Sequence, residues 1–182
     1  MRSKSLLIIA IALLVGCQHT GRTGKPLAKE LAGSDADAQL NFWHAITDEP
    51  IATNDQAFHA LLLYVDNKDE AADYAGRVAT LKKREMIPAH FDESADVGVK
   101  RGTVAMAIMK ILNEKGGVTT RVFGPSPRYA VRELMFLNVL PPSTPNQVLS
   151  GNELVGIIGR LEDYQRGNPA DVPAAVLPSE MK

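Results

Sequence analysis

The 182-residue sequence predicts a mainly α-helical fold, in which repeated helix-loop-helix units pack as one domain. Three observations support this. Six segments carry apolar residues at helical spacings of three and four. Strand-like patterns are scarce, and residues 117–123 are the best candidate for a short extended piece. Finally, the helical segments recur in a common order. A chain of this length can bury a single core.

The predicted helices lie between residues 38 and 166. In the first, Leu40, Trp43 and Ile46 share one face. Thr103, Glu153 and Asp55 fit the residue preferences of helix starts, and Ser126 is a candidate cap for the helix that begins near Arg128. The six predicted segments are residues 39–46, 55–65, 71–86, 103–113, 128–137 and 152–165.

A comparison of the chain with itself reveals repeats. Residues 78–88 align with 131–141 at an offset of 53, and residues 103–111 align with 153–161 at an offset of 50. Each unit is a helix, a turn with Ile-Pro or Leu-Pro, a polar loop and a second helix. Residues 53–62 match 150–159 more weakly. The sequence therefore predicts two clear units and a candidate third.

The second helix of a unit has almost no polar face, as residues 104–112 show. One unit cannot bury such a helix alone, but three units can cover one another's second helices. We expect the small residues Ala105, Ala107, Gly156 and Gly159 to permit close helix approach.

The first seventeen residues have the organisation of an export signal. Arg2 and Lys4 give a positive start, residues 6–15 are apolar, and Gly16 precedes Cys17, the only cysteine of the chain. Ten helical residues rise only about 15 Å, roughly half of a hydrocarbon core, so this stretch is too short to span a membrane.

The segment Leu14-Val15-Gly16-Cys17 resembles the lipobox of bacterial lipoproteins. The resemblance implies cleavage before Cys17, a diacylglycerol thioether on its sulfur and palmitate or a similar acyl chain on its amine. Two or three chains hold a protein firmly on a membrane. Gln18 stands where an inner-membrane retention signal has Asp, which favours the outer membrane, on the periplasmic side. The alternative is an ordinary signal peptide followed by an unrelated cysteine.

These features predict four regions. Residues 1–16 are the lipoprotein signal peptide, and residues 17–37 are the lipidated cysteine with a flexible tether rich in Gly, Thr, Ser and Lys. Residues 38–166 form the helical domain. Residues 167–182, with Pro169, Pro173 and Pro178, form a disordered tail.

The repeats resemble S-layer homology (SLH) domains, units of some fifty residues usually found in threes. The closest motif is Val99-Lys-Arg-Gly-Thr103, in which Arg101 corresponds to the family's ligand-facing arginine. The other copies have Asn54 and Gly151 at that position. The resemblance implies binding of cell-wall polysaccharide, often one with acidic ketal groups.

Composition and motifs limit the other function classes. Loss of residues 1–16 leaves 18 basic and 21 acidic side chains, a charge of −3 that argues against a nucleic-acid partner. His44, His59 and His90 lack metal-ligand spacing, and His59 is expected to face solvent or to be hydrogen-bonded. Residues 66–70 resemble a calcium loop without its glycine and are expected to form a solvated turn. We expect no metal, no cofactor and no catalysis.

The candidate ligand-binding residues are Arg101, Arg121, Arg128, Tyr129 and Arg132. Arginine grips carboxylates with two hydrogen bonds and tyrosine stacks on sugar rings, so these residues together would suit an anionic glycan. The alternative is a long connection whose arginines pair with acidic residues or helix ends.

The sequence thus predicts a lipid-anchored, non-catalytic binding or scaffolding module of the cell envelope, with an envelope polysaccharide as its leading ligand. A second hypothesis is a protein-interaction subunit of an envelope assembly that uses Trp43, Phe123 or Phe136. An enzyme would need His44, His59 or His90 beside a carboxylate in a cleft.

Overall fold

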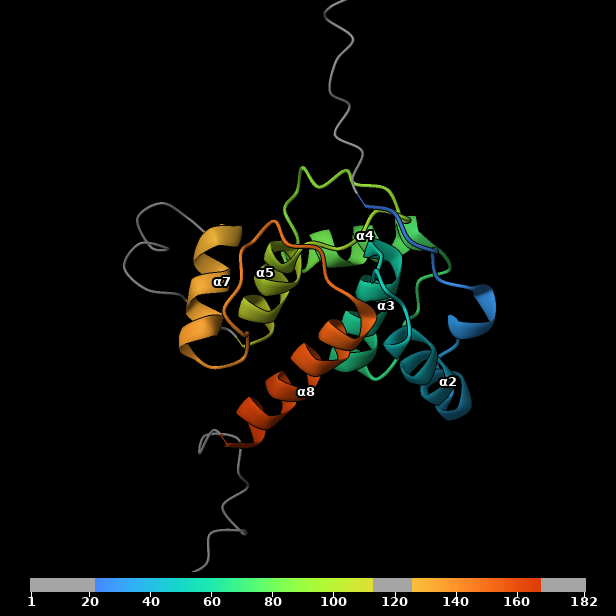
Figure 1. Ribbon diagram of the computed structural model, residues 1–182. Coiled ribbons are helices and arrows are strands. Elements are labelled where there is room, and N and C mark those ends of the chain that lie inside the picture. Colours follow the sequence, from blue (N-terminus) through green and yellow to red (C-terminus); the bar gives the residue numbers. More distant parts are fainter. Residues whose placement is uncertain (1–21, 113–125, 168–182) are drawn as a thin grey trace, which may run out of the picture.

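The computed structural model describes residues 22–112 and 126–167, and the mainly α-helical prediction is confirmed (Figure 1). All six predicted helical segments are helices, although their ends shift by a few residues. The candidate extended piece at residues 117–123 lies outside the described residues. The helices are α2 (Ala36–Thr47), α3 (Asn54–Asp66), α4 (Tyr74–Lys83), α5 (Arg101–Ile111), α7 (Pro127–Phe136) and α8 (Gly151–Gly167), and a 3-10 turn, η1, spans Lys29–Leu31.

Short-range hydrogen bonds set most of the helix starts. Thr53 and Gln56 form a capping box at α3, since each side chain accepts from the other's backbone N–H. Ser150 and Glu153 do the same before α8. Ser126 caps α7 as expected, its Oγ accepting from the Tyr129 amide at 3.4 Å. α5 differs, because it begins after Lys100 with no side-chain cap, so the expected role of Thr103 is wrong.

The turns after α4 and α7 are equivalent. Glu85 and Asn138 both adopt the left-handed conformation, with φ of 57° and 58°. In each turn the next amide reaches back to a helix carbonyl: Met86 N to Leu81 O and Val139 N to Leu134 O, both at 2.9 Å. These pairs are related by the offset of 53 that the sequence showed.

Three backbone hydrogen bonds close a ring between the units. Ala52 N donates to Leu149 O at 2.9 Å, Leu149 N donates to Val99 O at 3.1 Å, and Val99 N donates to Ala52 O at 2.8 Å. Each residue lies just before the second helix of its unit, at the aligned position. The candidate third copy is therefore a unit: unit 1 is α2 and α3, unit 2 is α4 and α5, and unit 3 is α7 and α8.

Helix packing also joins the three units to one another. α3 packs on α4, α5 on α7, and α8 on α2, so the second helix of every unit meets the first helix of the next and the last unit returns to the first. Figure 1 shows α5 beside α7 and α3 beside α4. The core is shared, with Phe58, Leu61, Ile108, Leu134 and Leu154 fully buried.

The predicted tether at residues 17–37 needs a correction. Residues 22–34, here called the strap, lie against the body. Gly98 N donates to Arg22 O at 2.7 Å, and Gly24 N donates to Asp96 O at 2.9 Å. Ser34 Oγ accepts from Asp69 N at 2.8 Å. The domain therefore begins at residue 22 at the latest, and only residues 17–21 of the predicted tether lie outside the described part.

Glycine supports close approach at positions other than the expected ones. A Cβ at Gly151 would lie 1.6 Å from the Ile46 carbonyl oxygen, and one at Gly102 would lie 2.6 Å from Pro127 Cβ. A Cβ at Gly156 or Gly159 would meet no described atom within 4 Å, so the expected role of these two glycines is wrong. Ala105 and Ala107 are buried as expected.

None of the described helices combines the length and apolar character needed to cross a membrane.

Candidate functional site

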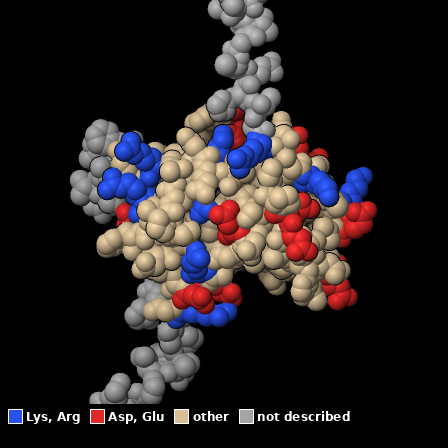
Figure 2. All heavy atoms as spheres, viewed as in Figure 1, with Lys and Arg blue, Asp and Glu red and all other residues tan. Residues whose placement is uncertain are grey.

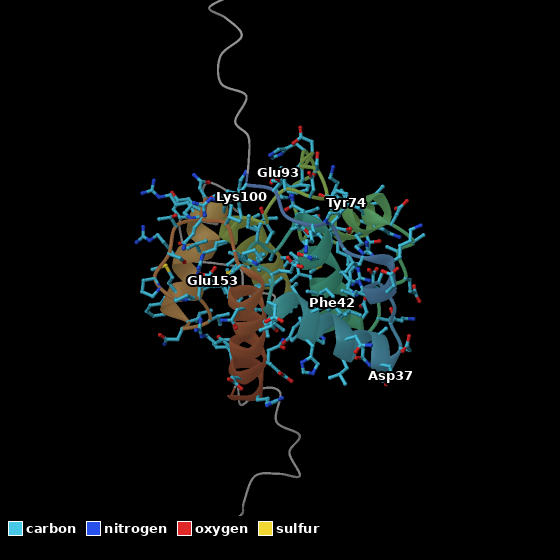
Figure 3. The ribbon with its side chains drawn as sticks, turned by 45° about the vertical axis from the view of Figure 1, so that its right-hand side comes forward. Asp37, Phe42, Tyr74, Glu93, Lys100 and Glu153 are labelled. Atoms are coloured by element: carbon cyan, nitrogen blue, oxygen red, sulfur yellow. The ribbon has the colours of Figure 1, made fainter. Side chains whose placement is uncertain are left out.

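A groove of about 710 Å³ opens where units 1 and 3 meet the strap, and we call it the strap groove. The strap contributes Arg22, and the residue before α5 contributes Lys100. Figure 3 shows Lys100 at the top of the body with Glu153 below it, at the start of α8. The other lining residues are polar or small apolar: Thr144, Asn146, Gln147, Ser150, Pro50, Ile51 and Val148.

Among the described residues, Glu153 is the only acidic one that lines the strap groove, and its carboxylate is already engaged. Glu153 Oε1 accepts from Arg101 Nη2, and Oε2 accepts from Ser150 N at 2.9 Å and from Ser150 Oγ at 3.2 Å. Within the described residues, Arg22 forms no ion pair, whereas Lys100 pairs with Glu93. The groove therefore carries more positive than negative charge.

A second groove, of about 230 Å³, lies on the other side of Lys100. Asp92, Glu93 and His90 line it together with the apolar side chains of Phe91 and Met106. Figure 3 shows Glu93 next to Lys100. Two carboxylates and one lysine line this groove. It therefore attracts an anionic ligand less strongly than the strap groove does.

The predicted binding residues are not brought together. Arg101 is 2% exposed and pairs with Glu153, so its expected role as a ligand-facing residue is wrong in this structure. Arg128 and Arg132 are exposed and Tyr129 is half-buried on α7, where basic side chains gather at the left of Figure 2. None of these four lines the strap groove or the second groove. Arg121 lies outside the described residues.

Arg101 is buried because the start of α5 lies against the start of α8. Glu153 belongs to unit 3 and lies at the start of α8, where its capping box fixes the carboxylate. The ring places the start of α5 beside it, since Arg101 N donates to Gln147 O at 2.9 Å. Arg101 Nε and Nη1 have no hydrogen-bond partner among the described atoms.

The three candidate histidines are scattered. His44 is exposed on α2, and His90 is exposed and lines the second groove with Asp92 and Glu93. His59 is hydrogen-bonded, one of its two expected states: Nδ1 lies 2.7 Å from Asp69 Oδ2, and the ring is 0% exposed. This pair of a histidine and a carboxylate has no access to solvent. No cluster of three metal-ligating side chains occurs in the described ranges.

The described structure also contains a charge cluster that the sequence did not indicate. We call Asp55, His59, Asp69 and Arg77 the buried charge cluster. Arg77 bridges the two carboxylates, with Nη1 2.7 Å from Asp55 Oδ1 and Nε on Asp69 Oδ2. The expected solvated turn at residues 66–70 is thus wrong for Asp69. The available signal was Asp55 and His59 at a spacing of four on an otherwise apolar helix.

Burial and hydrogen bonds shift the pKa of Asp69 in opposite directions. Burial alone would raise the pKa of Asp69, but hydrogen bonds from His59, Arg77 and the Ala71 amide together hold it below its usual range. Burial also raises the pKa of Tyr74, followed by the effect of Asp55, and its hydroxyl donates to Glu93 O at 2.7 Å. The Asp69 carboxylate therefore stays ionised at neutral pH.

The cluster holds the strap in place. Leu27 N donates to Asp55 Oδ2 at 3.3 Å, and the Asp69 amide donates to Ser34 Oγ. The arrangement is structural, and a smaller cavity of about 160 Å³ beside Asp69 is lined by charges of both signs, so the two grooves are the better candidate ligand surfaces. Comparisons of this chain with protein-family models, with curated proteins and with solved structures each found no match.

Proposed function

We propose that this chain is a lipid-anchored protein of the bacterial envelope that binds a cell-wall or envelope polysaccharide without catalysis. The supporting observation is the closed ring of three units with an open polar groove at one junction. Three units in the order seen here are what the SLH-like pattern of the sequence implies. Arg22, the first described residue and five positions after Cys17, lines this groove.

The lining of the strap groove suits a sugar chain. Thr144, Asn146, Gln147 and Ser150 present hydroxyls and amides that donate to and accept from sugar hydroxyls. Pro50 and Ile51 offer an apolar side for the C–H face of a sugar ring.

The lipid anchor would hold the body close to the membrane. Only four residues separate Cys17 from Arg22. Five steps of extended chain span at most about 18 Å. A lipidated Cys17 would therefore hold the strap groove close to the membrane surface, next to the part of the wall that faces that membrane.

Two experiments test this proposal. The lipidated full chain, in detergent micelles, is incubated with isolated wall sacculi that retain their polysaccharide, and with neutral dextran beads as control. We expect retention on the sacculi alone. Equal recovery from both supports would exclude specific wall binding.

The anchor is tested separately in cells. We expect wild-type protein to incorporate an alkynyl palmitate label and to fractionate with membranes. Cys17→Ser is expected to lose both. A Cys17→Ser variant that stays in the membrane fraction would exclude the lipid anchor.

One observation favours the alternative of a protein-interaction subunit. Phe136, at the end of α7, is 81% exposed and Leu40 is 57% exposed. Trp43 is only partly exposed and packs on Phe42 at 5.0 Å between ring centroids. Phe123 lies outside the described residues. This alternative expects a specific envelope protein to co-purify with wild type and to be lost with Phe136→Ser, while Arg22→Gln keeps it.

A further inference from the structure

We infer that Arg22 and Lys100 form an anion site in the strap groove, so that the segment that follows the lipid-bearing cysteine is itself part of the binding surface. The ligand class is a saccharide that carries carboxylate groups. The wall as the source of that saccharide rests on the proposed function, whereas the anion site does not.

The charges of the groove support an acidic ligand. Arg22 and Lys100 are its two cations, and both hydrogen-bonding oxygens of Glu153 are occupied by Arg101 and Ser150. The ion pair between Lys100 and Glu93 is partly exposed, with side chains 40% and 26% accessible, and such pairs are weak enough for a ligand carboxylate to compete with Glu93. Figure 2 shows basic side chains at the top of the body, where the described chain begins. An incoming carboxylate thus meets two donors and no free acid in this groove.

The position of Arg22 is fixed by its backbone. Gly98 N donates to Arg22 O, and Thr23 forms an antiparallel bridge with Val97. A Cβ on Gly98 would lie 2.6 Å from Val148 Cγ1, 2.8 Å from Ile51 Cγ2 and 3.0 Å from Arg22 O. Gly98 therefore lies under the groove at the point where the strap, unit 1 and unit 3 converge.

The other cations are poorer candidates. Arg101 is buried and neutralised by Glu153, and Arg128 and Arg132 do not line the strap groove. The second groove shares Lys100 but adds two carboxylates. Of the cations considered, Arg22 and Lys100 are the pair that shares a groove without a competing free carboxylate.

The test measures binding of the lipidated full chain, in detergent micelles, to polygalacturonate as an acidic probe, to dextran as a neutral probe and to wall sacculi. The variants are Arg22→Gln and Lys100→Gln. Arg160→Gln is the matched control, because Arg160 is exposed on α8 and does not line the groove. Arg22→Gln retains the main-chain hydrogen bonds of the strap, and slow hydrogen exchange of the Gly98 amide verifies that the strap stays bound.

We expect Arg22→Gln and Lys100→Gln each to weaken polygalacturonate binding roughly tenfold, because one charge-assisted hydrogen bond is worth about that factor. Arg160→Gln should bind like wild type, and dextran should not bind. Added salt should weaken wild-type binding more than Arg22→Gln binding.

The outcomes separate this inference from the proposed function. If sacculi and polygalacturonate bind Arg22→Gln and Arg160→Gln equally well, the anion site is wrong and wall binding stands. If polygalacturonate binding depends on Arg22 but sacculi are not bound, the site stands and the proposed wall ligand is wrong. If wild type binds neither polymer, both are wrong.

Discussion

Arg77 is the residue on which the buried charge cluster depends. Its planar guanidinium presents separate N–H groups to Asp55 and Asp69, a geometry that a lysine ammonium cannot reproduce. The two carboxylates in turn bind the strap through the Leu27 amide and the Asp69–Ser34 contact. One buried arginine thus connects α3, α4 and the strap.

Loss of Arg77 should destabilise the fold strongly. We expect Arg77→Leu to lower the free energy of unfolding by about 3–5 kcal/mol, because it leaves two buried carboxylates without their cation. Urea denaturation measures this. Arg84→Leu is the matched control, since Arg84 pairs with Asp66 at the surface and its loss should cost less than about 1 kcal/mol. Equal losses in the two variants would contradict the structural role of the cluster.

The cluster should also make stability depend on pH. Because the pKa of Asp69 is lower in the folded than in the unfolded chain, its stabilising contribution is complete above the usual aspartate pKa of about 3.9 and is lost as pH falls through the folded pKa. We expect the urea midpoint of wild type to fall steeply below about pH 4. Asp69→Asn should flatten that fall, whereas Asp37→Asn, on the exposed start of α2, should not. An unchanged profile in Asp69→Asn would contradict the prediction.

At the residue scale, sequence predicted local roles better than distant partners. The Ser126 cap follows from a three-residue contact and is confirmed. The pairing of Arg101 with Glu153 spans 52 residues and depends on the ring that brings α5 and α8 together. Asp69 looked solvated because nothing local shows that Arg77 and His59 will enclose it.

At the scale of elements, the six helices followed from their periodicity, and the strap did not. Residues 22–34 have no apolar repeat, and their hydrogen bonds go to residues 55, 69, 96 and 98, far along the chain. Such a segment has the composition of a tether until its partner is known. The offsets of the repeats, by contrast, predicted the equivalent turns at Glu85 and Asn138.

The start of α8 has the least room for change. We expect Gly151→Ala to destabilise the fold strongly, because its Cβ would lie 1.6 Å from the Ile46 carbonyl oxygen and the contact between α8 and α2 would have to open. Thermal denaturation followed by circular dichroism measures the effect.

Gly156→Ala is the matched control on the same helix. It meets no described neighbour, and we expect it to stabilise the protein by roughly 0.5–1 kcal/mol, since alanine favours helix interiors over glycine. Destabilisation by both substitutions to the same degree would show that the close approach at Gly151 is not the cause.

At the scale of the molecule, the three units should unfold together. The three main helix pairs, α3 with α4, α5 with α7 and α8 with α2, each join two different units. No unit therefore keeps its core when another opens. Trp43 fluorescence reports on α2, whereas far-ultraviolet circular dichroism reports on all helices. We expect both signals to give the same urea midpoint. Two separated transitions would show that the units are independent.

The ring of three hydrogen bonds has a consequence for the order in which the chain folds. Ala52 N donates to Leu149 O, and α2 packs on α8. The first helix, α2, can therefore pack on its partner only after the chain has been synthesised as far as α8. Contacts this distant in sequence form late and slowly. If Cys17 is lipidated as proposed, the N-terminal end would be fixed in the membrane while unit 1 still exposes apolar surface.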